Sequence, residues 1–346
     1  MLDLKDLEYS ELSEYIKSVG APRFRAEQIF SWLHAGVCSY DEMTNISKKT
    51  RAVLEKNTYV STLKIIEKYV SKLDGTVKYL FELPDGNAIE SVVMRYEHGL
   101  TICISSQVGC RMGCRFCAST IGGLYRSLTA GEMLNQVIFA QKDMGERIGN
   151  VVIMGIGEPM DNLDNIKKFL HNINNDKGLN IGYRHITIST CGVVPGIYSL
   201  AEENLPITLA ISLHAPNDGI RNTIMPINRK YPIAELIKAC HDYYNTTGRR
   251  ITFEYSLISG VNDGKKEARE LAALIGDIHA HVNLIPVNKV EERAYKKGTR
   301  REIEEFCSVL KELGINATIR RELGADISAS CGQLRKRTLN LDTAVK

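Results

Sequence analysis

Apolar residues recur with different periods in different parts of this chain. In the first 62 residues they lie three and four positions apart, as in Leu12, Tyr15, Ile16 and Val19. This spacing puts them on one face of a helix, and Gly20 follows as a stop signal. The pattern predicts a small N-terminal helical domain over residues 1–62.

The next stretch, residues 63–95, has a shorter period. Its apolar runs TLKIIEKYV, VKYLFEL and IESVVMRY are separated by the turn signals Asp74-Gly75 and Pro84-Asp85-Gly86. Short runs bounded by such turns are typical of antiparallel strands. We therefore predict a β-meander that links the helical domain to the rest of the chain.

From residue 96 to 324, short apolar runs alternate with helical patterns. Such alternation indicates right-handed βαβ units around a parallel sheet, and about six units favour an incomplete (βα)6 barrel of the TIM type. The predicted fold class is α/β, and residues 325–346 form a C-terminal tail. The predicted strands are 101–106, 150–155, 185–190, 207–213, 251–257, 281–286 and 316–321, and the predicted helices are 130–144, 163–173, 232–247, 263–275 and 299–313.

Unusual polar residues cluster where these strands end. In parallel barrels the carboxyl ends of the strands share one rim, where functional sites lie. We therefore expect the side chains that follow successive strands to meet there. They are Cys110, Cys114 and Cys117 after the first strand, Gly157 and Glu158 after the second, Ser189 at the third, Ser212, Leu213 and His214 at the fourth, and Asn288 after the sixth.

The three cysteines have the spacing C-x3-C-x2-C, with no fourth cysteine nearby. An iron–sulfur cubane is usually held by four thiolates, so three would leave one iron open to a ligand. The alternative is a zinc site that takes Cys103 as its fourth thiolate. Cys103 lies inside a predicted strand, whereas the other three lie in a loop.

Composition limits the class of protein. The chain has 346 residues, of which 44% are hydrophobic and 25% charged, and its net charge of +3 is too small to demand a polyanionic partner. No apolar run reaches the roughly 18 residues of a membrane span, and the start is acidic where a signal peptide would be basic. Nine irregularly spaced cysteines fit a reducing compartment. We expect a cytoplasmic protein without a membrane segment.

Some residues carry little signal taken singly. Glu90 in the meander reads as a surface residue, and Cys331 near the end of the chain reads as an inert thiol. Basic clusters that could contact RNA are Arg249-Arg250, Arg320-Arg321 and Arg335-Lys336-Arg337.

Several separated motifs, in order, resemble the radical S-adenosylmethionine (SAM) superfamily and, within it, the RlmN/Cfr family of RNA methyltransferases. The resemblance covers nearly the whole chain. The motifs are CISSQVGC at 103–110, the cysteine triplet, GIGEPMDN at 155–162, SLHAPN at 212–217, MPIN at 225–228, HVNLIPVN at 281–288 and CGQL at 331–334.

This resemblance implies two cofactors. A 4Fe–4S cluster would be bound by Cys110, Cys114 and Cys117, and its open iron would be chelated by SAM. The residues that match the family's SAM pocket are Gly157, Glu158, Ser189, Ser212, Leu213, His214 and Asn288.

It also implies a reaction, the methylation of C2 of adenosine in 23S ribosomal RNA at the peptidyl transferase centre and in tRNA beside the anticodon. Cys331 would carry the methyl group as S-methylcysteine, and two SAM molecules would be used in a ping-pong sequence. Cys103 would be the resolving thiol that forms a transient disulfide with Cys331, and Glu90 the proton acceptor. The resemblance further implies an electron donor such as flavodoxin or ferredoxin, and we expect a monomer.

Two alternatives remain. A Cfr-like enzyme would methylate C8 of adenosine, although Pro159 after Glu158 favours C2. A non-catalytic, zinc-stabilised RNA-binding protein would use Cys103 with the three loop cysteines.

Overall fold

A single large sheet organises the molecule. The computed structural model describes residues 1–334 and 337–338, and its main sheet runs in the order β14-β13-β12-β11-β10-β9-β6-β5-β4-β3, with β15 beside β5. Seven of these strands are parallel: β6 (Gly99–Ile104), β9 (Ile148–Ile153), β10 (Ile186–Thr190), β11 (Thr208–Ser212), β12 (Ile251–Leu257), β13 (Ala280–Pro286) and β14 (Ala317–Ile319).

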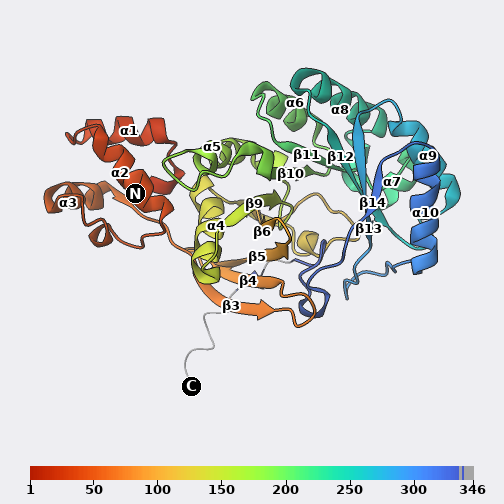
Figure 1. The fold of residues 1–346 in the computed structure, drawn as a ribbon, viewed down its shortest axis with the longest axis horizontal. Coiled ribbons are helices and arrows are strands. Elements are labelled where there is room, and N and C mark those ends of the chain that lie inside the picture. Colours follow the sequence, from red (N-terminus) through yellow and green to blue (C-terminus); the bar gives the residue numbers. More distant parts are fainter. Residues whose placement is uncertain (335–336, 339–346) are drawn as a thin grey trace.

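Helices cover the outer face of the parallel strands (Figure 1). The first, α4, starts with a capping box between Thr129 and Glu132 and ends at Gly145 in the left-handed conformation. Its apolar side chains join those of the strands in one core. The helices are α4 (Ala130–Met144), α5 (Leu163–Asn174), α6 (Val194–Glu202), α7 (Asp218–Ile224), α8 (Ile233–Thr247), α9 (Lys265–Ile275) and α10 (Arg300–Glu312).

The predicted α/β fold with an incomplete barrel is confirmed, because the path of strands in the described residues has two ends and does not close. The five predicted barrel helices match α4, α5, α8, α9 and α10 within one or two residues at most ends. The helical patterns did not include α6 or α7. α6 has nine residues and α7 has seven, so both are shorter than the roughly 11 to 18 residues over which helical periodicity is read.

The N-terminal residues form a separate small core at one end of the molecule (Figure 1). This part contacts α4 through Lys5, whose Nζ donates to Asn135 Oδ1 at 2.7 Å, and through Asp6, which accepts from the backbone N–H of Gly131 at 2.7 Å. A two-residue strand pair that the periodicity missed lies beside the helices. The elements are β1 (Leu2–Asp3), α1 (Tyr9–Ser18), α2 (Phe24–His34), α3 (Lys48–Asn57) and β2 (Thr58–Tyr59).

The predicted meander is present as three antiparallel strands that continue the sheet. Its two faces differ: Tyr79 and Val93 join the main core, whereas Val92 packs with Cys103 against the loop that follows β14. The strands are β3 (Lys64–Val70), β4 (Val77–Glu82) and β5 (Asn87–Tyr96), and the backbone of β15 (Arg337–Thr338) pairs with the start of β5.

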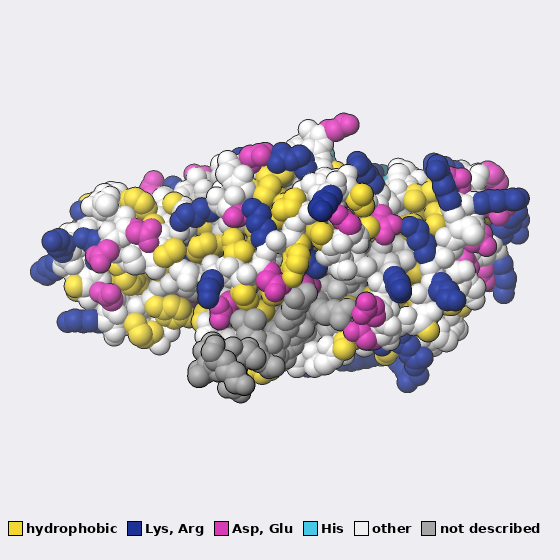
Figure 2. Space-filling model, turned by 90° about the horizontal axis from the view of Figure 1, so that it is seen from below, with side chains coloured by type: hydrophobic (Ala, Val, Ile, Leu, Met, Phe, Trp, Pro, Cys, Tyr) yellow, Lys and Arg dark blue, Asp and Glu magenta, His cyan; other side chains and the backbone are white. Residues whose placement is uncertain are grey.

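Charged side chains of both signs are mixed over the face seen in Figure 2. A polyanion bound to this face would therefore contact local basic groups and not one continuous basic band. Two residues of the predicted basic tail, Arg335 and Lys336, lie outside the described residues. No described helix combines the length and the apolar character that a membrane crossing requires.

Candidate functional site

One cavity opens at the carboxyl ends of the parallel strands. Its empty volume is about 960 Å³, including its open mouth, which is within the range of small-molecule sites. The structure brings most of the predicted site residues to this cavity. Its lining includes Cys110, Cys114, Cys117, Gly157, Glu158, Ser189, Ser212, His214, Asn288 and Cys331.

The three loop cysteines lie together at one end of the cavity, after β7 (Gln107–Gly109). Burial raises the pKa of Cys110 to about 12, and burial together with the other two thiols raises the pKa of Cys114 well above its usual value. Thiolates form here only if a cation compensates their charge, which is what a bound metal centre supplies.

The arrangement suits a cluster better than a single ion. Among the described residues, no three His, Cys, Asp or Glu side chains converge closely enough to hold one metal ion. Cys103 lines a second, smaller cavity with Cys117 and is not among the residues that line the cavity with Cys110 and Cys114. In the described residues the four-cysteine zinc site is therefore not assembled, whereas the three loop cysteines line one cavity together.

Gln107 connects the cysteine loop to the loop after β9. Its Oε1 accepts from the backbone N–H of Glu158 at 2.9 Å, and its Nε2 donates to Asp161 Oδ2 at 3.1 Å. Gly157 lies against the same side chain with φ +114°, and a Cβ there would come within 2.7 Å of Gln107 Cβ. Only glycine fits this close approach.

The Glu158 carboxylate is fixed from both sides. Its oxygens accept from the backbone N–H groups of Met160 at 3.1 Å and Cys191 at 2.8 Å. Burial raises the pKa of Glu158, although these hydrogen bonds oppose the shift. The carboxylate is thus held at the cavity wall as an acceptor for a ligand's donor group.

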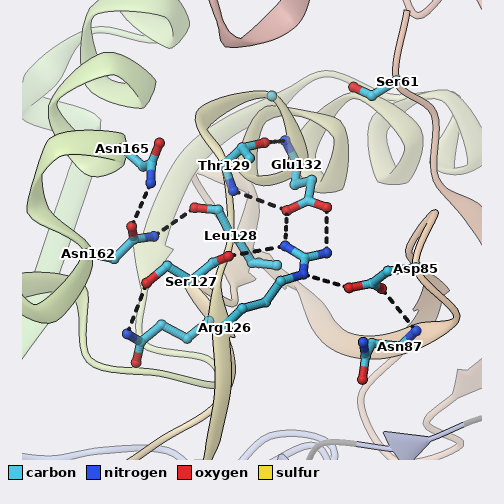
Figure 3. Close-up of polar contacts among 12 residues, drawn as sticks. Ser61, Asp85, Asn87, Arg126, Ser127, Leu128, Thr129, Glu132, Asn162 and Asn165 are labelled. Carbon is cyan, nitrogen blue, oxygen red and sulfur yellow. Dashed lines mark hydrogen bonds and ion pairs between the residues drawn. The ribbon is translucent and has the colours of Figure 1, made fainter. Parts of the chain in front are cut away.

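A polar network outside the cavity holds the strand that follows the three cysteines (Figure 3). Arg126, on β8 (Leu124–Ser127), donates to both oxygens of Glu132 at 2.7 and 2.8 Å and to Asp85 at 2.6 Å. Asn162 Nδ2 donates to the carbonyl of Leu128 at 2.8 Å. The network joins the meander turn, the strand after the cysteine loop and the start of α4.

His214 forms part of the opposite wall in a defined tautomer. Its Nδ1 accepts from the backbone N–H of Ser256 at 2.9 Å, so the ring can present only Nε2–H as a donor. Burial, with the charge of Arg221 second, lowers the pKa of His214 to about 3, and the ring is neutral at physiological pH. Nearby, the hydroxyls of Ser189 and Ser212 are 3.3 Å apart.

One predicted pocket residue does not line the cavity. The side chain of Leu213 belongs to the main core, so any contact of this residue with a ligand would come from its backbone. Its carbonyl accepts from Nε of Arg221 at 3.0 Å, and the same guanidinium donates to the carbonyls of Cys191 at 2.7 Å and Ser212 at 3.2 Å. Arg221 thus ties two strand ends together, and no motif in the sequence pointed to it.

Cys331 is held over the cysteine loop by backbone contacts. Asn288 Nδ2 donates to the Cys331 carbonyl at 2.9 Å, and the N–H of Ala118 donates to the Gly332 carbonyl at 2.8 Å. Ser119 Oγ donates to the carbonyl of Leu334 at 2.7 Å. The predicted methyl-carrying thiol is therefore fixed at the mouth of the cavity.

Cys103 and Cys331 share the smaller cavity, and both are free thiols in this structure. Burial, with Cys331 as the second cause, raises the pKa of Cys103 to about 12. Arg320 lines the same space, and its Nη1 is 3.7 Å from Glu254 Oε2. Arg320, which the sequence offered as part of a basic cluster that could contact RNA, therefore lines the cavities and lies near a buried carboxylate.

Glu90 lies on β5 and is buried, not at the surface as its sequence context suggested. Its Oε1 is 3.8 Å from Nζ of Lys78. It is not among the residues that line the described cavities around Cys331.

Comparison with known proteins identifies the chain's relatives. The sequence model of the radical SAM superfamily matches residues 104–274, and that of the ribosomal RNA large subunit methyltransferase N-terminal domain matches residues 2–60. A protein of Alkaliphilus oremlandii named "Probable dual-specificity RNA methyltransferase RlmN" is 56% identical over 98% of each chain. Its namesake in Desulforamulus reducens is 55% identical over 97% of this chain and 96% of that one.

A solved structure agrees with these relatives. The crystal structure of a radical SAM methyltransferase from Sphaerobacter thermophilus superposes with a TM-score of 0.92 and 44% identity, covering 96% of this chain and 99% of that one. The resemblance inferred from the motifs is confirmed. The chain belongs to the RlmN family of the radical SAM superfamily.

Proposed function

We propose that this protein is a radical SAM methyltransferase that methylates C2 of adenosine in RNA. Its substrates would be 23S ribosomal RNA at the peptidyl transferase centre and the tRNA adenosine beside the anticodon. The observation that carries the proposal is one rim where three cluster-type thiols, six of the seven predicted SAM-pocket residues and Cys331 line a single cavity. Cytoplasmic action and an electron donor such as flavodoxin or ferredoxin belong to the same proposal.

In the first half-reaction, the Cys331 thiolate attacks the methyl carbon of one SAM. The new S–CH3 bond makes S-methylcysteine, and S-adenosylhomocysteine leaves. Asn288 and Ala118 hold the carbonyls of Cys331 and Gly332, and so fix the backbone that directly follows the sulfur-bearing residue during this displacement. Pre-positioning of this kind lowers the barrier by removing motion before the reaction.

Six cavity residues would bind the second SAM, including Glu158 as an acceptor for its ammonium group and His214 as a donor through Nε2–H. When bound to Cys110, Cys114 and Cys117, a 4Fe–4S cluster would supply the electron that splits this SAM into methionine and a 5′-deoxyadenosyl radical, which takes a hydrogen atom from the methyl group on Cys331. The buried side chains of its walls, such as Glu158 and His214, would limit the access of water to the radical.

The S–CH2 radical on Cys331 then adds to C2 of the adenine. Glu90 accepts the C2 proton as the adduct gives up one electron, and the cluster that Cys110, Cys114 and Cys117 would hold would be the acceptor of that electron. The Cys103 thiolate attacks the sulfur of Cys331, which breaks the S–CH2 bond and forms the Cys103–Cys331 disulfide. The electron pair left on the carbon takes a proton, so the base carries a methyl group, and an external thiol reduces the disulfide.

The test is the modified nucleoside. Anaerobically reconstituted full-length protein is incubated with SAM, a reductant and a 23S ribosomal RNA transcript that spans the peptidyl transferase centre. We expect 2-methyladenosine by mass spectrometry of the digested RNA, and none with Cys331→Ala. Detection of 8-methyladenosine instead would establish the Cfr-like alternative, and a colourless zinc protein with no methylated product would overturn the proposal.

Cys103 has its own signature. Because the resolving thiol is needed only for release, Cys103→Ala should accumulate the covalent protein–RNA adduct. Normal turnover in that variant would remove Cys103 from the mechanism.

A further inference from the structure

A buried lysine joins the meander to the loop that carries Cys331. Lys78 is on β4 and is 5% exposed. Its Nζ lies 3.8 Å from Glu90 Oε1 and donates to the carbonyl oxygen of Ser328 at 3.2 Å. The ring of Tyr69 lies 5.2 Å from the same ammonium. A buried ammonium is tolerated only where it is paired and hydrogen-bonded, so these contacts favour a single arrangement.

The register of the sheet places Lys78 on the same face as Cys103. Val92 is opposite Lys78 on one neighbouring strand and opposite Cys103 on the other. Residues that pair across strands share a face, as do residues two apart along a strand. Lys78, Glu90 and Cys103 therefore lie on the same face, over which the Cys331 loop passes.

Backbone geometry points the loop at this lysine. Ser328 has φ +50°, a left-handed conformation that few residues other than glycine adopt. Gly324 and Gly332, with φ +64° and +80°, bend the chain on either side of it. The Ser328 carbonyl is thus presented to Lys78 three residues before Cys331.

The turn between β3 and β4 holds the start of the same loop. Asp326 accepts from Ser71 Oγ at 2.7 Å and from the N–H of Lys72 at 2.9 Å. The N–H of Gly324 donates to Asp74 Oδ2 at 2.9 Å. The loop is therefore attached to the meander before Cys331 and to the cysteine loop after it.

We propose that Lys78 is a positioning residue that fixes the Cys331 loop against the meander and, through the same ammonium, orients the Glu90 carboxylate. The inference rests on the proposed function. Its effect is on the methyl-transfer geometry and not on the binding of cluster, SAM or RNA. A misplacement of about 1 Å between reacting groups can cost on the order of 100-fold in rate.

The experiment compares Lys78→Met and Lys78→Arg with Lys64→Met in the full-length, reconstituted protein. Lys64 is a matched control, because it also pairs with a glutamate of the meander, Glu82 at 3.4 Å, but its side chain is 76% exposed. The readouts are iron content, SAM cleavage without RNA, and kcat and KM for methylation of the 23S ribosomal RNA transcript.

We expect Lys78→Met to keep its iron and its SAM cleavage while kcat falls about 10- to 100-fold and KM for RNA stays within about twofold. Lys78→Arg should recover most of kcat, and Lys64→Met should match the wild type. A kcat for Lys78→Met within about twofold of wild type would overturn the inference. So would equal defects in Lys78→Met and Lys78→Arg.

If Lys78→Met fails to fold, Asp326→Ala tests the same attachment from the exposed end of the loop. It should lower kcat by about 3- to 10-fold with KM unchanged, and a wild-type kcat would contradict the inference. Absence of methylated adenosine with the wild-type protein would instead mean that the proposed function is wrong, so the two failures are distinct.

Discussion

The parallel and antiparallel parts of the sheet present their functional side chains in different ways. In the parallel part, Glu158, Ser212 and Asn288 lie just after or at strand ends and meet at one rim. In the meander, Lys78 and Glu90 lie within strands and share a face with Cys103. The parallel strands thus contribute the residues at their carboxyl ends to the site, whereas the meander strands contribute side chains that lie along one face.

The difference follows from strand direction. Carboxyl ends of parallel strands lie at the same edge, so each strand can contribute a side chain or two to one cavity. In antiparallel strands successive ends lie at opposite edges, and only side chains along a common face can converge. If this division is functional, the rim should control cofactor binding and radical formation, whereas the meander face should control what happens at Cys331.

The largest effect should come from the rim. Cys114→Ala removes one of three cluster thiols, so iron binding and SAM cleavage should both be abolished. Cys307→Ala is the control, because this thiol lies on the buried face of α10, in the main core. Iron analysis and quantification of 5′-deoxyadenosine check the result. SAM cleavage that persists in Cys114→Ala would contradict the assignment of cofactor binding and radical formation to the rim.

Glu90→Gln should show the opposite behaviour. Loss of the proton acceptor should lower the rate of adenosine methylation by about 10²- to 10⁴-fold, while iron content and SAM cleavage stay at wild-type levels. Glu82→Gln, on the neighbouring strand, should have little effect. The methylated nucleoside and 5′-deoxyadenosine are measured in the same reaction. Loss of both products to the same extent would mean that Glu90 acts in cofactor binding or radical formation, as the rim residues do.

A smaller effect is expected at Arg126, which connects the two parts through Asp85 and Glu132. Arg126→Met should lower the free energy of unfolding by about 1.5 to 3 kcal/mol, the range for hydrogen bonds to charged groups. Arg126→Lys should retain part of this stability. Arg300→Met is a control at an exposed ion pair within α10, where solvent screens the two charges and little stability should be lost. The variants are compared by urea denaturation. Equal losses of unfolding free energy in Arg126→Met and Arg300→Met would mean that the contacts of Arg126 with Asp85 and Glu132 do not stabilise the fold.

The free energy of unfolding of this protein should depend on pH through one buried histidine, His34. Burial lowers the pKa of His34 from 6.5 to about 3, while its Nδ1 accepts from the N–H of Leu179 at 3.2 Å. Between these pH values the unfolded chain binds more protons than the folded one, so stability is full above about 6.5 and falls as pH decreases.

The contribution of one such histidine is up to about 1.4 kcal/mol per pH unit. His34→Gln keeps an acceptor for Leu179 and should flatten the dependence of the unfolding free energy on pH without changing methylation at neutral pH. Urea midpoints measured across the window check this. An unchanged slope would mean that His34 is not the group that titrates.

The sequence predicted those helices and site residues that a single local pattern determines. Periodicity predicted α4, and strand ends predicted the rim residues. Leu213 was harder, because its strand-end position gave no indication that the side chain turns into the core. Glu90 and Arg221 carried no local signal of their own. The position of Glu90 is set by the pairing of β5 with strands that come before and after it in the sequence. The role of Arg221 arises from its hydrogen bonds to backbone carbonyls that lie far apart in the sequence.

The unclosed cylinder has a further consequence. The chain leaves the edge strand β14, crosses the interior side of the sheet through residues 320–334 and pairs with β5 near the other edge. Among the described residues, no ladder of hydrogen bonds joins β14 to β5 directly. The segment that carries the reactive sulfur is therefore also a link between these two parts of the wall. A single proteolytic cut within it should loosen the mouth of the barrel as well as free the sulfur.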